Sequence, residues 1–456
     1  MLDHTIAAIA TPLGEGGLSV IRISGTEAFQ IADKVFVPSG KNARAPSTAN
    51  SHTLHHGHIT RNGTIIDEVL LSIMRAPRTF TRENVVEVSC HGGIVATKAV
   101  LDTVLAAGAR LALPGEFTRR AFLNGRIDLA QAEAIADLIY ARTELALTAA
   151  NEQLAGKLSQ RINEVRDRLM RTLAHVEAHI DFPDEDISPD TQKQLLAAID
   201  SGIEFIDQLL STAGEGQLLR RGIRAAIIGR PNAGKSSLLN QLLGHDRAIV
   251  SPQPGTTRDT IEETANIRGI PVVFVDTAGL REARDEIETE GIRRSHQTIS
   301  RAELILHVLD SSEPFQDKNE AQLREFAPRR RILVLNKDDL PRRLELPASI
   351  KEPAVSVSCQ TGAGIEDLKD AIKNAVWEGQ IHSEMLQVMV NSRHEDALRR
   401  GRTALVAAAE ALRSGQTLEV VAMELRIGVN AVGEIVGKTT TEDLLDSIFS
   451  QFCIGK

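Results

Sequence analysis

The stretch from Ile223 to Leu243 constrains the fold of this chain more than any other. Its apolar run 225–228 predicts a buried parallel strand, and the loop Gly229-Arg-Pro-Asn-Ala-Gly-Lys-Ser236 follows directly. Residues 237–243 then have the apolar spacing of a helix. A strand, a glycine-rich loop and a helix in this order predict a P-loop, whose backbone N–H groups and helix N-terminus face a polyphosphate.

The residues of this loop have distinct expected roles. Gly229 and Gly234 let the backbone wrap closely around phosphates. Lys235 can reach the β- and γ-phosphates, and the Ser236 hydroxyl is a candidate Mg²⁺ ligand. A chance match to a glycine turn is the alternative for the loop taken alone. The other nucleotide-binding candidates in this segment are Asn232, Ala233 and Ser237.

Two segments after the P-loop are typical of a nucleotide switch. Residues 271–275 predict a buried strand that leads to Asp276-Thr277-Ala278-Gly279, where the aspartate can hold Mg²⁺ through water and Gly279 can donate to the γ-phosphate. Earlier, Gly255-Thr256-Thr257 stands where a first switch loop belongs, and Thr257 is a second candidate Mg²⁺ ligand.

Two further segments predict that the base is guanine. The predicted strand 331–335 ends in Asn336-Lys337-Asp338-Asp339, an Asn-Lys-x-Asp motif. Asp339 can accept hydrogen bonds from guanine N1–H and the exocyclic amine, a donor pair that adenine lacks. The predicted strand 355–359 leads into a loop with Ser358 and Cys359, which we expect to cover the base. Four motifs in this order predict a domain that binds GTP with Mg²⁺.

The position that orients the attacking water in Ras-like GTPases is not a glutamine here. It is Leu280, which cannot hold a water molecule. Hydrolysis therefore needs another polar group, and carboxylates in 282–290 are the candidates.

Composition narrows the class of protein and its location. The 456-residue chain is long enough for about three domains. Its formal net charge of −9 argues against a general polyanion binder, and its three scattered cysteines fit a reducing compartment. The N-terminus shows no secretory pattern, and no run of ~18 apolar residues predicts a membrane span. We expect a cytoplasmic protein.

The remaining sequence divides around the nucleotide-binding segment. Residues 1–118 predict a small α/β domain, with strands at 5–10, 18–24, 69–74 and 85–89 and a helix at 96–107. Residues 119–216 predict long helices that end at a glycine hinge, 214–216; a G domain at 217–380 follows, and 381–456 is helical again. We predict one helical domain interrupted by an inserted domain, with two separate helical domains as the alternative.

The whole chain resembles a known family of bacterial and organellar tRNA-modification GTPases, called MnmE or TrmE. The most specific match is the C-terminal Phe452-Cys-Ile-Gly-Lys456. The other matching segments, besides the P-loop and Gly-Thr-Thr-Arg-Asp259, are Ala10-Thr-Pro-Leu-Gly-Glu-Gly-Gly17, Arg22-Ile-Ser-Gly25, His91-Gly-Gly93, Pro114-Gly-Glu-Phe117, Arg120-Ala-Phe-Leu-Asn124 and Asp128-Leu-Ala-Gln-Ala-Glu-Ala134.

The resemblance implies an architecture and a reaction. It implies a dimerising, folate-binding-like N-terminal α/β domain and a discontinuous helical domain that carries an inserted Ras-like P-loop G domain. It also implies a homodimer that forms a heterotetramer with the FAD-dependent MnmG (GidA) protein. Together they would place an aminomethyl or carboxymethylaminomethyl group on carbon 5 of the wobble uridine, position 34, of certain tRNAs.

The resemblance further implies how GTP is hydrolysed. K⁺ would replace an arginine finger, held by Asn232 and by switch I, for which we expect Ser251, Gln253 and Thr256; Ser251 and Thr256 are also expected to contact GTP. Glu288 would orient the attacking water. Relatives more often have a threonine and an apolar residue where this chain has Ser251-Pro-Gln-Pro254, which affects the expected shape of the K⁺ loop.

A folate site is implied as well. Its polar contacts would be Arg22, Glu87, Arg126 and Lys456, with 5,10-methylene- or formyl-tetrahydrofolate as the one-carbon donor. Each of these charges, taken alone, would be ordinary surface. Cys453 is a candidate nucleophile beside that site, with a small tail residue as the alternative.

Two alternative functions remain open from the sequence. One is a ribosome-assembly GTPase, although no second P-loop and no basic Gly-x-x-Gly loop follows residue 380. The other is a GTP-binding switch without strong intrinsic hydrolysis. The most basic clusters, 220–224 and 329–331, are interpreted as ordinary surface or linker, so we expect that much of the tRNA contact belongs to the partner protein.

Overall fold

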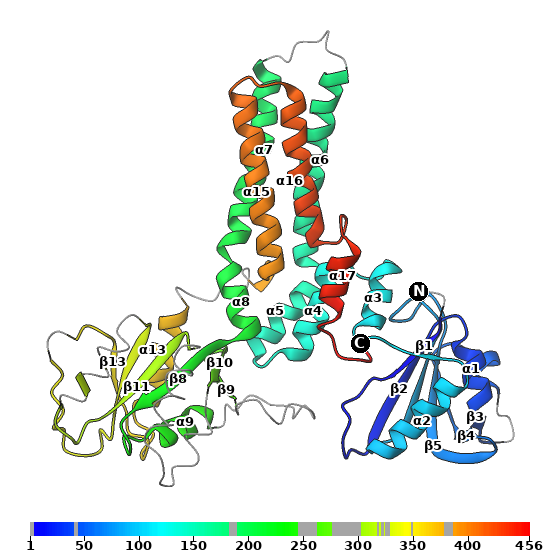
Figure 1. The fold of residues 1–456 in the computed structure, drawn as a ribbon, viewed down its shortest axis with the longest axis horizontal. Helices are drawn as coiled ribbons and strands as arrows, with labels where there is room; N and C mark the ends of the chain where they lie inside the picture. Colours follow the sequence, from blue (N-terminus) through cyan, green and yellow to red (C-terminus); the bar gives the residue numbers. More distant parts are fainter. Residues whose placement is uncertain are drawn as a thin grey trace. The chain divides into compact units, whose positions relative to one another are not determined.

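The computed structural model describes most of the chain in two compact units. The described residues are 4–40, 44–181, 189–244, 262–275, 302–316, 319–320, 323, 329–347, 350–377 and 386–456. The first unit comprises 1–136, 159–173 and 425–456, and the second comprises 137–158 and 174–424. Two sheets and a set of long helices confirm the predicted mixture of α/β and all-α structure (Figure 1).

The first unit is built on a seven-stranded sheet with the order β3-β4-β5-β6-β2-β1-β7. Neighbouring strands are antiparallel except β1 and β7, which pair in parallel. The strands are β1 Ile6–Ile9, β2 Leu18–Ser24, β3 Phe36–Pro38, β4 Thr53–Arg61, β5 Thr64–Met74, β6 Val85–His91 and β7 Arg110–Leu111.

Helices α1 (Ala28–Val35) and α2 (Ile94–Ala106) pack on one face of this sheet. Alternate residues of the strands, such as Ile21 and Val88, point into that core and are fully buried. The residues between them lie on the other face, where Arg22 on β2 stands opposite Glu87 on β6. A short 3₁₀ turn, η1 (Pro46–Thr48), precedes β4.

The C-terminal end of the chain returns to this first unit. Helix α3 (Glu116–Leu123) packs against α17 (Glu442–Phe449). The backbone N–H groups of Gly115 and Phe117 donate to the carbonyls of Cys453 and Lys456, at 3.4 and 3.1 Å. Gly455 has φ +97°, and a Cβ there would lie 2.2 Å from the carbonyl oxygen of Ile9. Only glycine therefore fits where the tail crosses β1.

The second unit contains a six-stranded sheet with the order β13-β12-β11-β8-β10-β9. All its pairs are parallel except β9–β10, as expected for a doubly wound nucleotide-binding sheet. The strands are β8 Ile223–Gly229, β9 Glu263–Ile267, β10 Ile270–Phe274, β11 Leu304–Asp310, β12 Arg331–Asn336 and β13 Ala354–Ser356. Helices α9 (Lys235–Leu243) and α13 (Ile365–Val376) complete its core.

Long helices supply the rest of the structure. In the second unit, α7 and α15 lie side by side although about 180 positions separate them in sequence, and the Arg402–Asp207 and Arg413–Asp200 ion pairs join them (Figure 1). The helices are α4 Leu129–Tyr140, α5 Glu144–Leu154, α6 Lys157–Asp181, α7 Pro189–Ser211, α8 Ala213–Arg221, α15 Ser392–Arg413 and α16 Leu418–Ile435.

The glycine hinge expected at 214–216 is instead part of a helix. Helix α8 runs through both glycines from Ala213 to Arg221. A Cβ at Gly216 would lie 2.5 Å from the carbonyl oxygen of Val390, so this glycine permits close packing against the segment before α15. Gly216 thus marks a close tertiary contact within a helix and not a loop.

Candidate nucleotide-binding site

The P-loop joins the carboxyl end of β8 to the N-terminus of α9. Two of its glycines have positive φ, +148° at Gly229 and +95° at Gly234. A Cβ at Gly229 would lie 2.3 Å from the carbonyl oxygen of Val308, and one at Gly234 would lie 2.1 Å from Nδ2 of Asn336. Glycine is therefore required at both positions, which brings the loop close to the neighbouring strands β11 and β12.

Lys235 lies folded over this loop at the first position of α9. Its ammonium group donates to the carbonyls of Gly229 and Arg230, at 3.0 and 2.9 Å. Burial lowers the pKa of Lys235 from its ordinary value. A partly desolvated ammonium at a helix N-terminus stabilises a polyphosphate strongly, because little water screens the attraction.

Asn336 connects the phosphate side of the site to the base side. This residue is 2% exposed. Its Nδ2 donates to the carbonyl of Ala233 in the P-loop at 2.8 Å, and its Oδ1 accepts from the backbone N–H of Cys359 at 3.2 Å. One side chain thereby fixes the distance between two loops that different strands deliver.

A hydrogen bond from Ser358 orients the carboxylate of Asp339: the Ser358 hydroxyl donates to Oδ1 of Asp339 at 2.6 Å. Beside it, burial and the Asp339 charge raise the pKa of the Cys359 thiol to about 11. The Cys359 thiol is therefore neutral at the site, and Asp339 supplies a carboxylate able to accept hydrogen bonds from a base.

Lys235, Asn336, Asp339 and Cys359 line one cavity of about 730 Å³. The structure therefore brings together the P-loop and the Asn-Lys-x-Asp motif, which are about 100 positions apart in sequence. The lining residues are Pro231, Asn232, Gly234, Lys235, Ser236, Ser237, Asn336, Lys337, Asp339, Leu340, Cys359 and Gln360. Several expected site residues lie outside the described part of the chain: Ser251, Gln253, Thr256, Thr257, Asp276, Thr277, Ala278, Gly279, Leu280 and Glu288.

The residues expected at a folate site also gather, in the first unit. Arg22 Nε lies 2.8 Å from Glu87 Oε1, and the guanidinium groups of Arg22 and Arg126 lie over the ring of Phe80, at 6.0 and 5.5 Å from its centroid. The backbone of Lys456 is held nearby, because its carbonyl accepts from the Phe117 N–H at 3.1 Å. The guanidinium group of Arg22 also donates to the carbonyl of the preceding residue, Gly455, at 3.5 Å.

Two aromatic residues at this second site were not anticipated. Arg22 lies 5.7 Å from the ring centroid of Phe117 as well as over Phe80. Sequence gives no direct signal for this arrangement, because three separate segments bring the rings and the arginine together.

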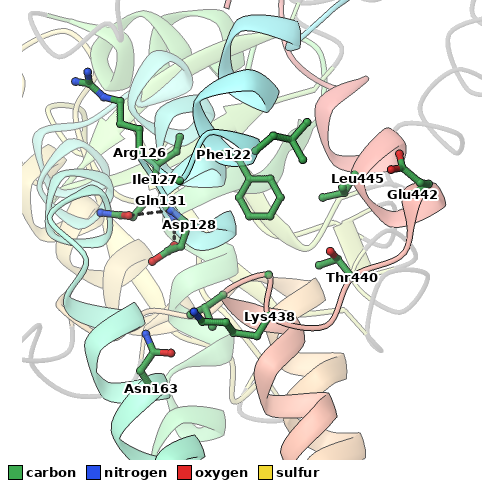
Figure 2. Close-up of a pocket in the computed structure, with 14 residues that line it drawn as sticks. Phe122, Arg126, Ile127, Asp128, Gln131, Asn163, Lys438, Thr440, Glu442 and Leu445 are labelled. Atoms are coloured by element: carbon green, nitrogen blue, oxygen red, sulfur yellow. Dashed lines mark hydrogen bonds between the residues drawn. The ribbon is translucent and has the colours of Figure 1, made fainter. Parts of the chain in front are cut away.

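A cavity of about 680 Å³ lies beside α4 in the first unit (Figure 2). Asp128 and Gln131 cap α4 by exchanging hydrogen bonds with each other's backbone N–H, at 2.9 and 3.0 Å. Arg126 is the member of the expected folate set that lines this cavity, and Figure 2 shows its side chain pointing away from Lys438 and Asn163. The capping explains the Asp128 and Gln131 pair without a ligand.

The sheet, the P-loop and the guanine-type motif define a P-loop GTP-binding protein. Comparison with known proteins identifies the family. The model for the MnmE helical domain matches residues 129–453, and the model for the N-terminus of the GTP-binding protein TrmE matches 5–126. The chain belongs to the MnmE family, which confirms the resemblance found in its sequence.

Full-length relatives agree with this assignment. The tRNA modification GTPase MnmE of Geobacillus kaustophilus is 46% identical over 461 residues, covering 99% of both chains. The protein of the same name from Geobacter sulfurreducens is 47% identical over 459 residues, covering all of both chains.

Among solved structures, the G domain of the T. maritima FeoB iron transporter is 28% identical and covers 34% of this chain and 99% of its own, with a TM-score of 0.26.

None of the described helices has a stretch long and apolar enough to cross a bilayer.

Proposed function

We propose that this protein hydrolyses GTP to support modification of carbon 5 of the tRNA wobble uridine, position 34. The product would be the aminomethyl or carboxymethylaminomethyl form. The observation that carries the proposal is a cavity that joins a P-loop to a guanine-recognition motif, in a chain 46% identical to a tRNA modification GTPase along its whole length. This family assignment favours it over a ribosome-assembly GTPase.

The chain's own residues would divide the work in the cavity. The P-loop N–H groups and Lys235 would bind the phosphates, and Ser236 would ligate Mg²⁺ with Thr257. Asp339, oriented by Ser358, would select guanine. The oxygen-rich donor set fits a hard divalent cation.

For hydrolysis we propose K⁺ in the role of an arginine finger. Asn232 has a left-handed backbone, φ +62°, and lines the cavity, which supports it as a ligand. Ser251, Gln253 and Thr256 would complete the K⁺ site, and Glu288 would orient water where Leu280 cannot. A cation there supplies positive charge against the developing charge on the phosphates.

The site in the first unit would bind 5,10-methylene- or formyl-tetrahydrofolate. Two guanidinium groups over Phe80 suit an anionic glutamate tail, and Glu87 suits the donors of a pterin ring. Lys456 would contribute a third cation. Cys453 remains the candidate nucleophile, because its backbone is anchored at Gly115 and its side chain is exposed.

The proposed assembly is cytoplasmic and is a heterotetramer of two copies of this chain and two copies of the FAD-dependent MnmG (GidA) protein, bound to tRNA. We propose that this chain dimerises through its N-terminal domain, residues 1–118. The other proposed domains are a helical domain formed by 119–216 and 381–456 and a G domain at 217–380. Size measurement of the mixed proteins tests the stoichiometry.

The experiment for GTP hydrolysis compares turnover in K⁺ and in Na⁺ at equal ionic strength. We expect fast turnover only in K⁺, lost in Asn232→Ala and Glu288→Ala. Equal slow rates in both salts would refute the K⁺ role and favour a GTP-binding switch.

The experiment for the folate site is calorimetric titration with 5-formyl-tetrahydrofolate. Arg22→Ala should weaken binding, whereas Arg78→Ala is the matched control, an exposed arginine two positions before Phe80. Equal affinities of the two variants would refute the assignment.

A further inference from the structure

Strand β11 ends beside the base-recognition motif. Its last residue, Asp310, is in register with Asn336, the last residue of β12. The next residue after β12, Lys337, places its ammonium group 2.5 Å from Oδ2 of Asp310. An ion pair therefore connects a strand with no nucleotide-binding motif to the wall of the cavity.

The carboxylate of Asp310 is fixed in place. It accepts from the backbone N–H and the hydroxyl of Ser312, at 2.9 and 2.6 Å, and its side chain is 11% exposed. Burial by itself would raise the pKa of Asp310, but hydrogen bonds from Lys337 and Ser312 outweigh burial and lower it. The group is thus a permanent anion with defined geometry at neutral pH.

Lys337 has two properties that make this contact important. Its backbone is left-handed, with φ +66°, and its side chain lines the cavity together with Asp339. Lys337 is only two positions before Asp339, the carboxylate that a guanine base would need. An untethered ammonium on a flexible stem would be attracted to Asp339 and would compete with the base for it.

We propose that Asp310 is a positioning residue for guanine recognition, which holds the Lys337 ammonium away from Asp339. This inference rests on the proposed GTP binding. Asp310 has two effects: it fixes the Lys337 stem as a wall beside the base, and it leaves the Asp339 carboxylate available to the base N1–H and amine.

The test measures steady-state GTP and ITP hydrolysis in K⁺ by the full-length chain. Inosine lacks the exocyclic amine, so the ratio of kcat/KM for the two nucleotides reports how well Asp339 engages the base. For Asp310→Asn we expect KM for GTP to rise about three- to tenfold, the cost of immobilising one long side chain, with kcat within about twofold. The GTP preference over ITP should fall.

Two further variants isolate the route of the effect. Glu313→Gln is the matched control, because Glu313 is an acid on the same loop that pairs with Arg230 at 3.0 Å and is half exposed. It should behave as wild type. Lys337→Met removes the ammonium and keeps the stem, so it should raise KM but retain the GTP preference over ITP. Adding Asp310→Asn to Lys337→Met should then change nothing further.

Several results would overturn the inference. One is a ratio of kcat/KM for GTP to that for ITP in Asp310→Asn equal to the wild-type ratio. Another is an additive effect of the two changes in the double variant. A third is a fall in kcat at unchanged KM in Asp310→Asn. If Asp310→Asn does not fold, Lys337→Met decides, and a loss of its GTP preference overturns the proposal. Failure of the wild type to prefer GTP over ATP would instead refute the proposed function.

Discussion

Replacing Asn336 with alanine removes the bridge between the P-loop and the base-covering loop. The change leaves two backbone groups without their hydrogen-bond partner. In the wild type, Asn336 donates to the carbonyl of Ala233 at 2.8 Å and accepts from the N–H of Cys359 at 3.2 Å. A buried polar group left without a partner costs about 1–3 kcal/mol. Part of that free-energy cost destabilises the protein without nucleotide and does not affect binding. The remainder weakens binding, so we expect the Kd for GDP to rise about tenfold to a hundredfold.

The assay is equilibrium titration with a fluorescent GDP, together with thermal unfolding of the protein without nucleotide. Asn391→Ala is the matched control in the same unit. Asn391 is also a buried asparagine, and it caps α15 by accepting from the His394 N–H at 2.8 Å. Its loss should cost about 0.5–2 kcal/mol of stability with no change in GDP affinity.

The outcome separates a bridging role from a general packing role. A Kd for Asn336→Ala within twofold of wild type, at unchanged Tm, would refute the bridge as the element that sets the loop spacing. Equal losses of affinity in the Asn336 and Asn391 variants would also refute it, because only Asn336 contacts both loops.

Three other results are expected. Although burial opposes it, hydrogen bonding, chiefly from Arg110, lowers the pKa of Glu116. Its stabilising contribution should therefore decline as pH falls below the ordinary value of 4.5 and be lost as pH falls through the lowered pKa, so urea unfolding of Glu116→Gln should show a weaker acid dependence than wild type. With iodoacetamide at pH 8, mass spectrometry should find exposed Cys453 alkylated well before Cys359, whose pKa is about 11; the reverse order would contradict the geometry. Gly455→Ala should displace the tail and increase carboxypeptidase cleavage, whereas unchanged cleavage would argue against the close approach.

The strand, loop and helix of the candidate nucleotide site were predictable because the information that specifies them is local. The apolar run, the glycines and Lys235 are adjacent in sequence, so the strand, loop and helix follow from short-range rules. The same rules placed Asp339 after a buried strand. The bridge through Asn336 was not predictable, because it depends on how far apart two parallel strands deliver their loops.

Contacts that depend on which strands are neighbours, and on their register, could not be predicted from the sequence. Arg22 and Glu87 pair because β2 and β6 are adjacent and antiparallel, which neither strand's own pattern reveals. Strand β11 and its terminal Asp310 gave no motif signal, although β11 lies next to both β8 and β12. The glycines at 214–216 were misinterpreted as a hinge for a similar reason, because the close contact of Gly216 is with Val390, which is remote in sequence.

Basic runs in the sequence are similarly uninformative until their neighbours are known. Arg220 pairs with Asp137, Arg224 with Glu262 at 3.3 Å, and Arg331 with Glu352. Both clusters considered for nucleic acid thus have charges neutralised by acidic residues that are distant in sequence. A phosphate contact by any of these arginines would have to break an existing ion pair, which removes part of the gain from counterion release. Arg331 is moreover buried on β12, so this residue of the second cluster is not the ordinary surface that the sequence suggested. A tRNA contact by these clusters would need cations without carboxylate partners.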